Sequence, residues 1–187
     1  PRLRAILTRP NTLDLRQAMD EGKLLIVNLA KGKLGEDVAS LFGALLVTQI
    51  GVTALGRADL PEEQRKDFFV YLDEFQTMTT LSIASMLAEL RKYRVSLVLS
   101  NQHLTQLDLK VRDAILGNVG TLITFRVGPE DAWVLQREFA PEFTITDLTR
   151  LPNYHIYSKM MIDRAVSAPF SARTLRNIDG MHRSSGR

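Results

Sequence analysis

The sequence predicts an α/β fold with a parallel sheet, and three observations predict it. Residues 68–72 are apolar without alternation, as in a parallel strand that is buried on both faces. Residues 81–93 then place apolar side chains on one helical stripe, and residues 95–99 form a second apolar run. Because a strand–helix–strand connection within one sheet is a right-handed crossover, the two strands are expected to be parallel and can be neighbours.

Three elements and a loop are expected before the first of these strands. In order, they are a helix at 12–22, a strand at 24–30, a helix at 36–54 and a charged surface loop at 57–66. Asn11 or Thr12 is expected to cap the first helix and Gly22 to end it. Apolar residues surround most of the 36–54 helix, as expected of a helix packed between two layers.

The C-terminal part predicts further helices and strands. In order, they are a loop and helix through 104–116, a strand at 121–127, a helix at 129–139, a short helix at 144–148 and a strand at 154–162. Trp133, Phe139 and Phe143 are expected to be core anchors, because they do not alternate with basic residues as a base-stacking platform would. Residues 166–187, rich in arginine, serine and glycine, are expected to form a basic, flexible tail.

Two adjacent carboxylates follow the strand at 68–72. Asp73 and Glu74 come at the end of a buried strand, where open α/β sheets bind their ligands. One interpretation is a Walker B motif, in which Asp73 holds Mg²⁺, partly through water, and Glu74 orients and deprotonates the water that attacks ATP. The alternative is a strand that simply ends in solvated acids.

The second strand also ends in polar residues, of which Gln102 is the most informative. The crossover brings Gln102 to the same sheet edge as the acidic pair. Its amide can donate a hydrogen bond to a γ-phosphate and accept one from the attacking water, so that it can sense the terminal phosphate. Gln102 alone would more often be an ordinary strand-end residue, but its spacing from the two acids favours a functional role.

Several stretches together resemble the HerA/FtsK superfamily of hexameric P-loop DNA translocases, in particular the coupling ATPases of type IV secretion and conjugation. They are residues 25–32 and 34–37, 71–76, 87–94 and 97–102. The resemblance implies a RecA-like, mostly parallel sheet with helices on both faces. It also implies ATP and Mg²⁺ as cofactors, a homo-hexamer, and DNA and secretion or conjugation machinery as partners. Asp73 and Glu74 match the family's Walker B pair and Gln102 its sensor glutamine.

Arg91 matches the position at which related motors carry an arginine that reaches the nucleotide of a neighbouring subunit. Such a guanidinium stabilises charge on the transferring phosphoryl group and makes hydrolysis depend on assembly. The sequence leaves a second interpretation equally open. Arg91, Lys92 and Arg94 also suit the negative end of a helix dipole without any catalytic role.

The largest departure from the family is that the chain has no Gly-x-x-x-x-Gly-Lys-Ser/Thr loop. The glycine and lysine cluster at 31–35 has the wrong spacing, and we interpret it as a helix N-terminal turn with a minor chance of contacting phosphate or DNA. In the family the loop precedes these motifs. We therefore expect residues 1–165 to be the C-terminal part of a RecA-like ATPase domain that does not hydrolyse ATP by itself.

Composition sets the remaining limits. A net charge of +3 does not by itself indicate nucleic-acid binding, and the absence of cysteine excludes disulfides and cysteine metal sites. No apolar run is expected to span a bilayer, so any membrane anchor is expected to lie outside this chain. The resemblance implies a cytoplasmic protein, placed at the cytoplasmic face of the inner membrane if such segments anchor it. Two other classes stay open: a noncatalytic RecA-like binding or assembly domain, and a carboxylate-based hydrolase on a similar sheet.

Overall fold

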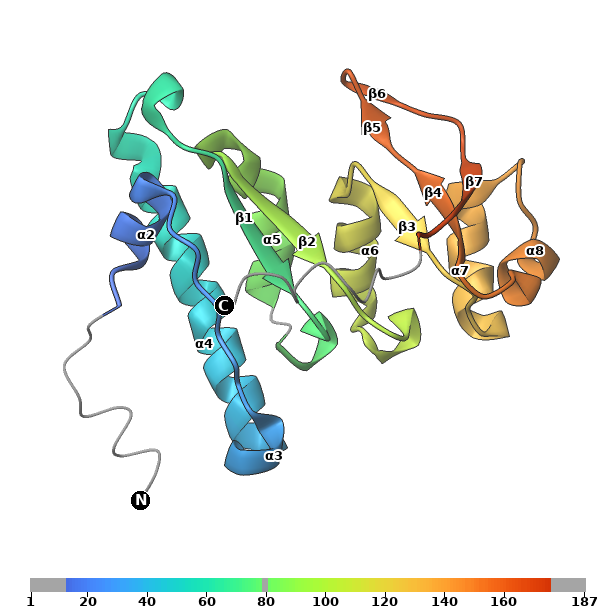
Figure 1. Cartoon of the computed structure of the whole chain (residues 1–187), viewed down its shortest axis with the longest axis horizontal. Coiled ribbons are helices and arrows are strands. Elements are labelled where there is room, and N and C mark those ends of the chain that lie inside the picture. Colours follow the sequence, from blue (N-terminus) through green and yellow to red (C-terminus); the bar gives the residue numbers. More distant parts are fainter. Residues whose placement is uncertain (1–12, 79–80, 176–187) are drawn as a thin grey trace, which may run out of the picture. The chain divides into compact units, whose positions relative to one another are not determined.

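The computed structural model describes residues 13–78 and 81–175, and these form two compact units. The first unit extends to Gln102 and includes Leu107–Asn118, and the second contains His103–Gln106 and the chain from Val119 onwards. Figure 1 labels the elements of both units. From Glu36 to Asn118 α-helices and strands alternate along the first unit and its two strands are parallel, which confirms the α/β fold class.

The first unit is built around a pair of parallel strands, β1 (Phe68–Leu72) and β2 (Val95–Leu99). Their register runs from Phe68 opposite Val95 to Leu72 opposite Leu99, as the crossover predicted. Between them the chain forms α5 (Leu81–Glu89) and a 3₁₀ helix, Leu90–Tyr93, in the place of the helix expected at 81–93. Further along the chain, α6 (Leu109–Asn118) packs against α5.

Helix α2 (Leu15–Glu21) opens the described part of the chain. Its N-cap is Asp14, whose side chain accepts a hydrogen bond from the Gln17 N–H at 2.9 Å, and not Asn11 or Thr12, which lie outside the described residues. The helix ends at Gly22 in a left-handed conformation with φ 72°, as expected.

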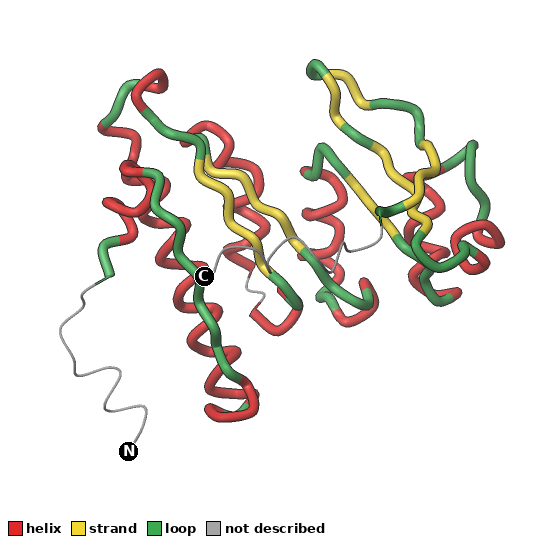
Figure 2. Tube along the Cα trace, in the orientation of Figure 1, coloured by secondary structure: helices red, strands yellow, loops and turns green. Residues whose placement is uncertain are grey.

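The strand expected at 24–30 does not form. Figure 2 shows this stretch as a loop that runs along α4 (Glu36–Gly56), after which come the short helix α3 (Lys31–Leu34) and α4 itself. A strand needs a hydrogen-bonded neighbour, and in the described part of the chain β1 pairs with β2 alone. The prediction of a strand at 24–30 was therefore wrong, because this apolar stretch has no strand partner in the described part of the chain.

Helix α4 is the central helix of this unit, and two glycines let it approach its neighbours closely. A Cβ added at Gly43 would lie 2.4 Å from atoms of the Met78 side chain, and one added at Gly51 would lie 2.5 Å from Met86. The segment Glu36–Asp59 is also long and apolar enough to cross a membrane, which corrects the expectation that no such run exists. This criterion considers length and composition alone, and the core helix of a soluble protein also meets it.

The stretch expected as a surface loop, 57–66, contains the most deeply buried charged residue of the first unit. Arg57 is fully buried and donates hydrogen bonds to the carbonyl oxygens of Tyr93 at 2.9 Å and Lys66 at 2.8 Å. Its Nε lies 3.1 Å from Oδ1 of Asp20. The prediction of a surface loop was therefore wrong for Arg57, because its guanidinium has hydrogen-bond partners in the protein that replace water.

The second unit is a small antiparallel sheet with two helices. The sheet has the order β3 (Leu122–Thr124), β4 (His155–Lys159), β7 (Phe170–Arg173), and β5 (Met161–Ile162) pairs with β6 (Ala165–Val166) as a separate hairpin. Helices α7 (Pro129–Phe139) and α8 (Ile145–Arg150) complete the unit. Strand β7 lies within the segment expected as a tail, of which residues 176–187 are outside the described part.

Of the three aromatic residues expected in the core, two lie in the core of the second unit and one does not. Phe139 is fully buried and Phe143 packs against the same cluster, with its ring centroid 3.8 Å from that of Tyr157. Trp133 is 61% exposed, so its assignment to the core was wrong. It lies on the outer side of α7, where the guanidinium of Arg137 is 5.2 Å from its ring centroid.

Candidate functional site

The candidate site lies where β1 and β2 end, and backbone hydrogen bonds hold the two chain segments together beyond the strands. The Ser100 N–H donates to the Leu72 carbonyl at 3.0 Å, and the Phe75 N–H donates to the Ser100 carbonyl at 3.1 Å. These bonds continue the parallel pairing past Leu72 and Leu99. The residues that follow each strand, acidic after β1 and polar after β2, are therefore fixed side by side.

Each acid receives a hydrogen bond from a polar residue that follows β2. Ser100 Oγ donates to Asp73 Oδ1 at 3.1 Å, and Gln102 Nε2 donates to Glu74 Oε1 at 3.2 Å. The Glu74 N–H also donates to Asp73 Oδ1 at 3.1 Å. The structure thus brings together three of the four predicted site residues, Asp73, Glu74 and Gln102, and adds Ser100 to them.

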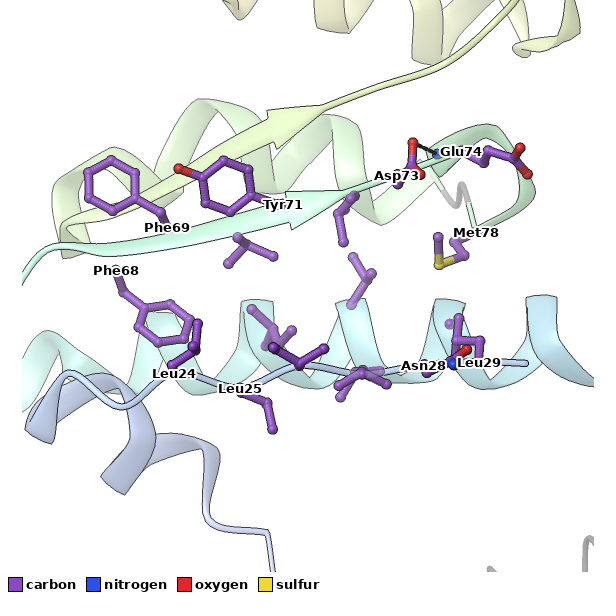
Figure 3. A pocket seen from close by; sticks show the side chains of 18 of the residues that line it. Leu24, Leu25, Asn28, Leu29, Phe68, Phe69, Tyr71, Asp73, Glu74 and Met78 are labelled. Atoms are coloured by element: carbon purple, nitrogen blue, oxygen red, sulfur yellow. Dashed lines mark hydrogen bonds between the residues drawn. The ribbon is translucent and has the colours of Figure 1, made fainter. Parts of the chain in front are cut away.

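The backbone at the acidic pair has an unusual conformation. Glu74 has φ 48°, in the left-handed region that residues with a Cβ rarely occupy. Figure 3 shows Asp73 and Glu74 at the end of β1, where the chain turns into the 3₁₀ helix Phe75–Met78. Such strained residues cluster at functional sites, where neighbouring contacts hold them in place.

Lys31 is the site residue that the sequence analysis did not assign. Its Nζ lies 2.8 Å from Glu74 Oε2, whereas the sequence predicted a helix N-terminal turn at 31–35 that could also contact phosphate or DNA. The hydrogen bond to Glu74 raises the pKa of the Lys31 ammonium, and the charges of Glu36 and Asp73 act in the same direction. Spacing alone could not reveal this contact, because it joins residues 43 positions apart.

An apolar cavity of about 890 Å³ lies beside the site, between the extended stretch at 23–30, helix α4 and strand β1. Most of its lining is aliphatic or aromatic, and Asp73 and Glu74 are at one end of it, as Figure 3 shows. Lys31 also lines the cavity. The polar site is therefore flanked by a surface that favours apolar contacts.

Arg91 is not near the acidic pair. It lies in the 3₁₀ helix that precedes β2, at the opposite end of the strand from Ser100 and Gln102. Its guanidinium is exposed and has no hydrogen-bond or ion-pair partner among the described residues. Arg91 therefore cannot act on the site of its own chain in this arrangement, and only a role at another subunit's site would be catalytic.

The oxygen donors at the site suit Mg²⁺. Asp73 is exposed, and the contacts described above leave its second carboxylate oxygen, Oδ2, available, with the Ser100 hydroxyl beside it. Mg²⁺ binds through one or two carboxylates, water and substrate phosphates rather than through a cage of protein ligands. Within the described ranges no cluster of three His, Asp or Glu side chains that could hold a metal ion exists.

No protein-family model and no curated protein matches the sequence. Among solved structures, the chain is similar to the unbound bacterial conjugative coupling protein TrwB, with a TM-score of 0.65 and 15% identity over 89% of this chain and 46% of that one. The complex of TrwB with a non-hydrolysable GTP analogue also has a TM-score of 0.65, with 16% identity over 93% of this chain and 47% of that one.

A second kind of match is the DNA-packaging ATPase B204 of Sulfolobus Turreted Icosahedral Virus, with a TM-score of 0.55 and 13% identity over 89% of this chain and 73% of that one. The chain spans about half the length of the coupling-protein structures that it matches. At this level of identity the similarity establishes the fold. The chain therefore has the α/β fold that conjugative coupling proteins share with viral DNA-packaging ATPases.

Proposed function

We propose that this chain is the Walker B and sensor part of a P-loop ATPase that couples ATP hydrolysis to DNA movement in conjugation or type IV secretion. The observation that carries the proposal is the meeting of Asp73, Glu74 and Gln102 at the ends of two adjacent parallel strands. The coupling and packaging ATPases with the same fold support the same conclusion.

Each residue has a role that its place supports. Asp73, with the Ser100 hydroxyl beside it, would hold Mg²⁺, which when bound neutralises charge on the β- and γ-phosphates. Glu74 orients the attacking water and accepts its proton at Oε1 or Oε2. Gln102 lies 3.2 Å from Glu74, so its amide is placed to sense whether a terminal phosphate is present.

The complete motor would be a hexamer that acts on DNA and the secretion or conjugation machinery at the cytoplasmic face of the inner membrane. The position of Arg91 supports assembly. It is exposed, lies at the strand end remote from the acidic pair, and its neighbours in the chain are anchored: Arg65 donates to the Lys92 carbonyl at 2.6 Å and Arg57 to the Tyr93 carbonyl at 2.9 Å. A rigidly presented arginine on the surface is suited to reach a neighbouring subunit's nucleotide.

The proposal assigns phosphate binding to polypeptide outside this chain, since the sequence has no phosphate-binding loop. We therefore expect the 187-residue chain to release no phosphate from ATP above background. Steady-state release by this chain that Glu74→Gln abolishes would overturn the proposal that the site is incomplete.

The decisive experiment is ATP hydrolysis by the full-length protein carrying Glu74→Gln, with Glu62→Gln as the control. Glu62 is an exposed acid of the same unit, remote from the site in sequence. Loss of a general base lowers turnover by roughly 10²- to 10⁴-fold, while nucleotide binding should persist. Unchanged turnover in Glu74→Gln would refute the role of Glu74, and nucleotide binding without hydrolysis in the unmodified protein would favour the noncatalytic domain.

The trans role of Arg91 needs mixed rings. Subunits with Arg91→Ala and subunits with Glu74→Gln are each expected to be inactive alone. Mixed, they should recover part of the activity, because some interfaces then combine an intact Glu74 with an intact Arg91 from the next subunit. Mixtures that stay inactive while forming rings would argue against action across the interface.

A further inference from the structure

Both carboxylate oxygens of Glu74 are occupied in this structure. Lys31 Nζ is 2.8 Å from Oε2 and Gln102 Nε2 donates to Oε1 at 3.2 Å. Each oxygen still has a second acceptor site and the Glu74 side chain is 42% exposed, so water can reach it in this state. Lys31 nevertheless holds a positive charge against Oε2, and a cation that approaches this oxygen must compete with that contact.

The backbone on both sides of the Lys31–Glu74 contact has a defined local conformation. Ala30, which precedes it, has φ 44°, and its N–H donates to the Asn28 side chain at 2.9 Å. Glu74, at the other end of the contact, has φ 48°. Non-glycine residues in left-handed conformations thus flank both ends of one ion pair, and such strain persists where surrounding contacts fix two elements against each other.

The ion pair is also reversible. Side-chain exposure is 38% for Lys31 and 42% for Glu74, so water competes for both charges. Exposed pairs of this kind contribute little net stability. Their exchange for other charged partners is therefore a small change for the fold.

We propose that Lys31 is the resting counter-ion of the acidic pair, occupying Glu74 until a divalent cation and phosphate take the place of that contact. The inference rests on the proposed function and adds a residue to its site. A magnesium-bound phosphate offers both charges a new partner: the carboxylates gain a cation and the ammonium gains an anion. The exchange frees Oε2 of Glu74 and couples the stretch at 23–31 to the occupancy of the site.

A purely structural role for the ion pair, as a clamp between α3 and the end of β1, makes a different prediction. A clamp can be removed without any gain in cation affinity. A counter-ion competes with the cation, so that its removal must tighten cation binding at Asp73 and Glu74. The two roles are therefore separated by a binding measurement that needs no ATP hydrolysis.

The test is Mn²⁺ binding by the 187-residue chain, measured from the electron paramagnetic resonance signal of free Mn²⁺. Lys31→Met should tighten binding about two- to fivefold, the range expected when an exposed ion pair is lost. Lys31→Gln, which keeps hydrogen-bond donors but no charge, should do the same, and Lys31→Arg should bind as the unmodified chain does. Lys110→Met, which removes an exposed lysine on α6, is the charge-matched control and should change nothing.

Unchanged or weaker Mn²⁺ binding in both neutral Lys31 variants would overturn the inference. Circular dichroism shows whether each variant is folded, and the use of two neutral variants guards against the failure of one. Asp73→Asn and Glu74→Gln separate this inference from the proposed function. If they abolish Mn²⁺ binding while the Lys31 variants do not alter it, only the Lys31 inference fails. If they too leave binding unchanged, the magnesium site itself is wrong.

Discussion

Replacement of Arg57 by methionine is expected to destabilise the first unit more than any other single change to a charged side chain. Arg57 is fully buried, and its guanidinium donates to the carbonyls of Tyr93 and Lys66. Its Nε lies 3.1 Å from the Asp20 carboxylate. Burial lowers the pKa of Arg57 and the Asp20 charge opposes that shift, and the guanidinium is charged in the folded protein.

The expected loss follows from these contacts. Hydrogen bonds from a charged donor contribute about 1.5 to 3 kcal/mol each, and removal of one partner of a buried ion pair costs about 3 to 5 kcal/mol. Asp20 keeps 29% side-chain exposure and its ion pair with Arg16, so water and Arg16 partly stabilise the charge left behind. We therefore expect the lower end of that range, about 3 kcal/mol for Arg57→Met. With a urea m-value of about 2 kcal/mol/M, the midpoint falls by roughly 1.5 M.

The assay is urea unfolding, monitored by hydrogen exchange in peptides that contain β1 and β2. Exchange in these peptides reports the stability of the first unit. The single tryptophan, Trp133, belongs to the second unit, so its fluorescence reports the unfolding of that unit separately. Arg94→Met is the control. Arg94 has 41% side-chain exposure and pairs with Asp67 at 3.4 Å, a kind of contact that contributes at most about 1 kcal/mol.

A loss of less than about 1 kcal/mol in Arg57→Met, or a loss no larger than that of Arg94→Met, would refute the reasoning. It would mean that the buried guanidinium does not hold the loop at 57–66 against the start of β2. Arg57→Lys keeps the charge but loses the planar fork. It should fall between the other two variants, because one ammonium cannot replace both carbonyl contacts and the Asp20 pairing.

Three further predictions follow from packing and charge. Gly51→Val should lower stability by about 1 to 3 kcal/mol in chemical unfolding, since its Cβ would meet Met86 at 2.5 Å, and wild-type stability would exclude the close packing of α4. Phe139→Ala should cost about 3 to 5 kcal/mol, whereas Trp133→Ala, at a 61% exposed position, should stay within about 1 kcal/mol; equal losses would contradict the core assignment. The capping hydrogen bonds lower the pKa of Asp147, so it stabilises the fold above its unfolded-state pKa and less as pH falls through its lower folded-state value. Asp147→Asn should weaken acid destabilisation in a pH series of unfolding curves, and an unaltered pH profile would contradict this.

The sequence predicted much of the site because its signals are local. An apolar run followed by Asp73 and Glu74, and a second run followed by Gln102, are sufficient to place these residues once the crossover rule makes the strands parallel. The structure adds that the two strands are direct neighbours, with Gln102 within hydrogen-bond distance of Glu74. Helix periodicity similarly located α4 and α5.

Burial was the less predictable property. Charge in the 57–66 stretch suggested a surface loop, yet Arg57 is fully buried because backbone carbonyls from distant segments satisfy it. The aromatic character of Trp133 suggested a core position, yet α7 turns it outward. Arg57 is charged and yet buried, and Trp133 is aromatic and yet exposed, because the contacts of each side chain in the folded protein decide its environment.

The amino-acid sequence by itself determined which segments are helical or apolar, and that acids and an amide follow two such strands. Only the tertiary structure decided that Lys31 pairs with Glu74, that the stretch at 24–30 stays unpaired, and that Arg91 lies remote from the acidic pair. The physical reason is that local patterns record the preferences of neighbouring residues, whereas ion pairs and strand partners depend on distances between segments far apart in the chain.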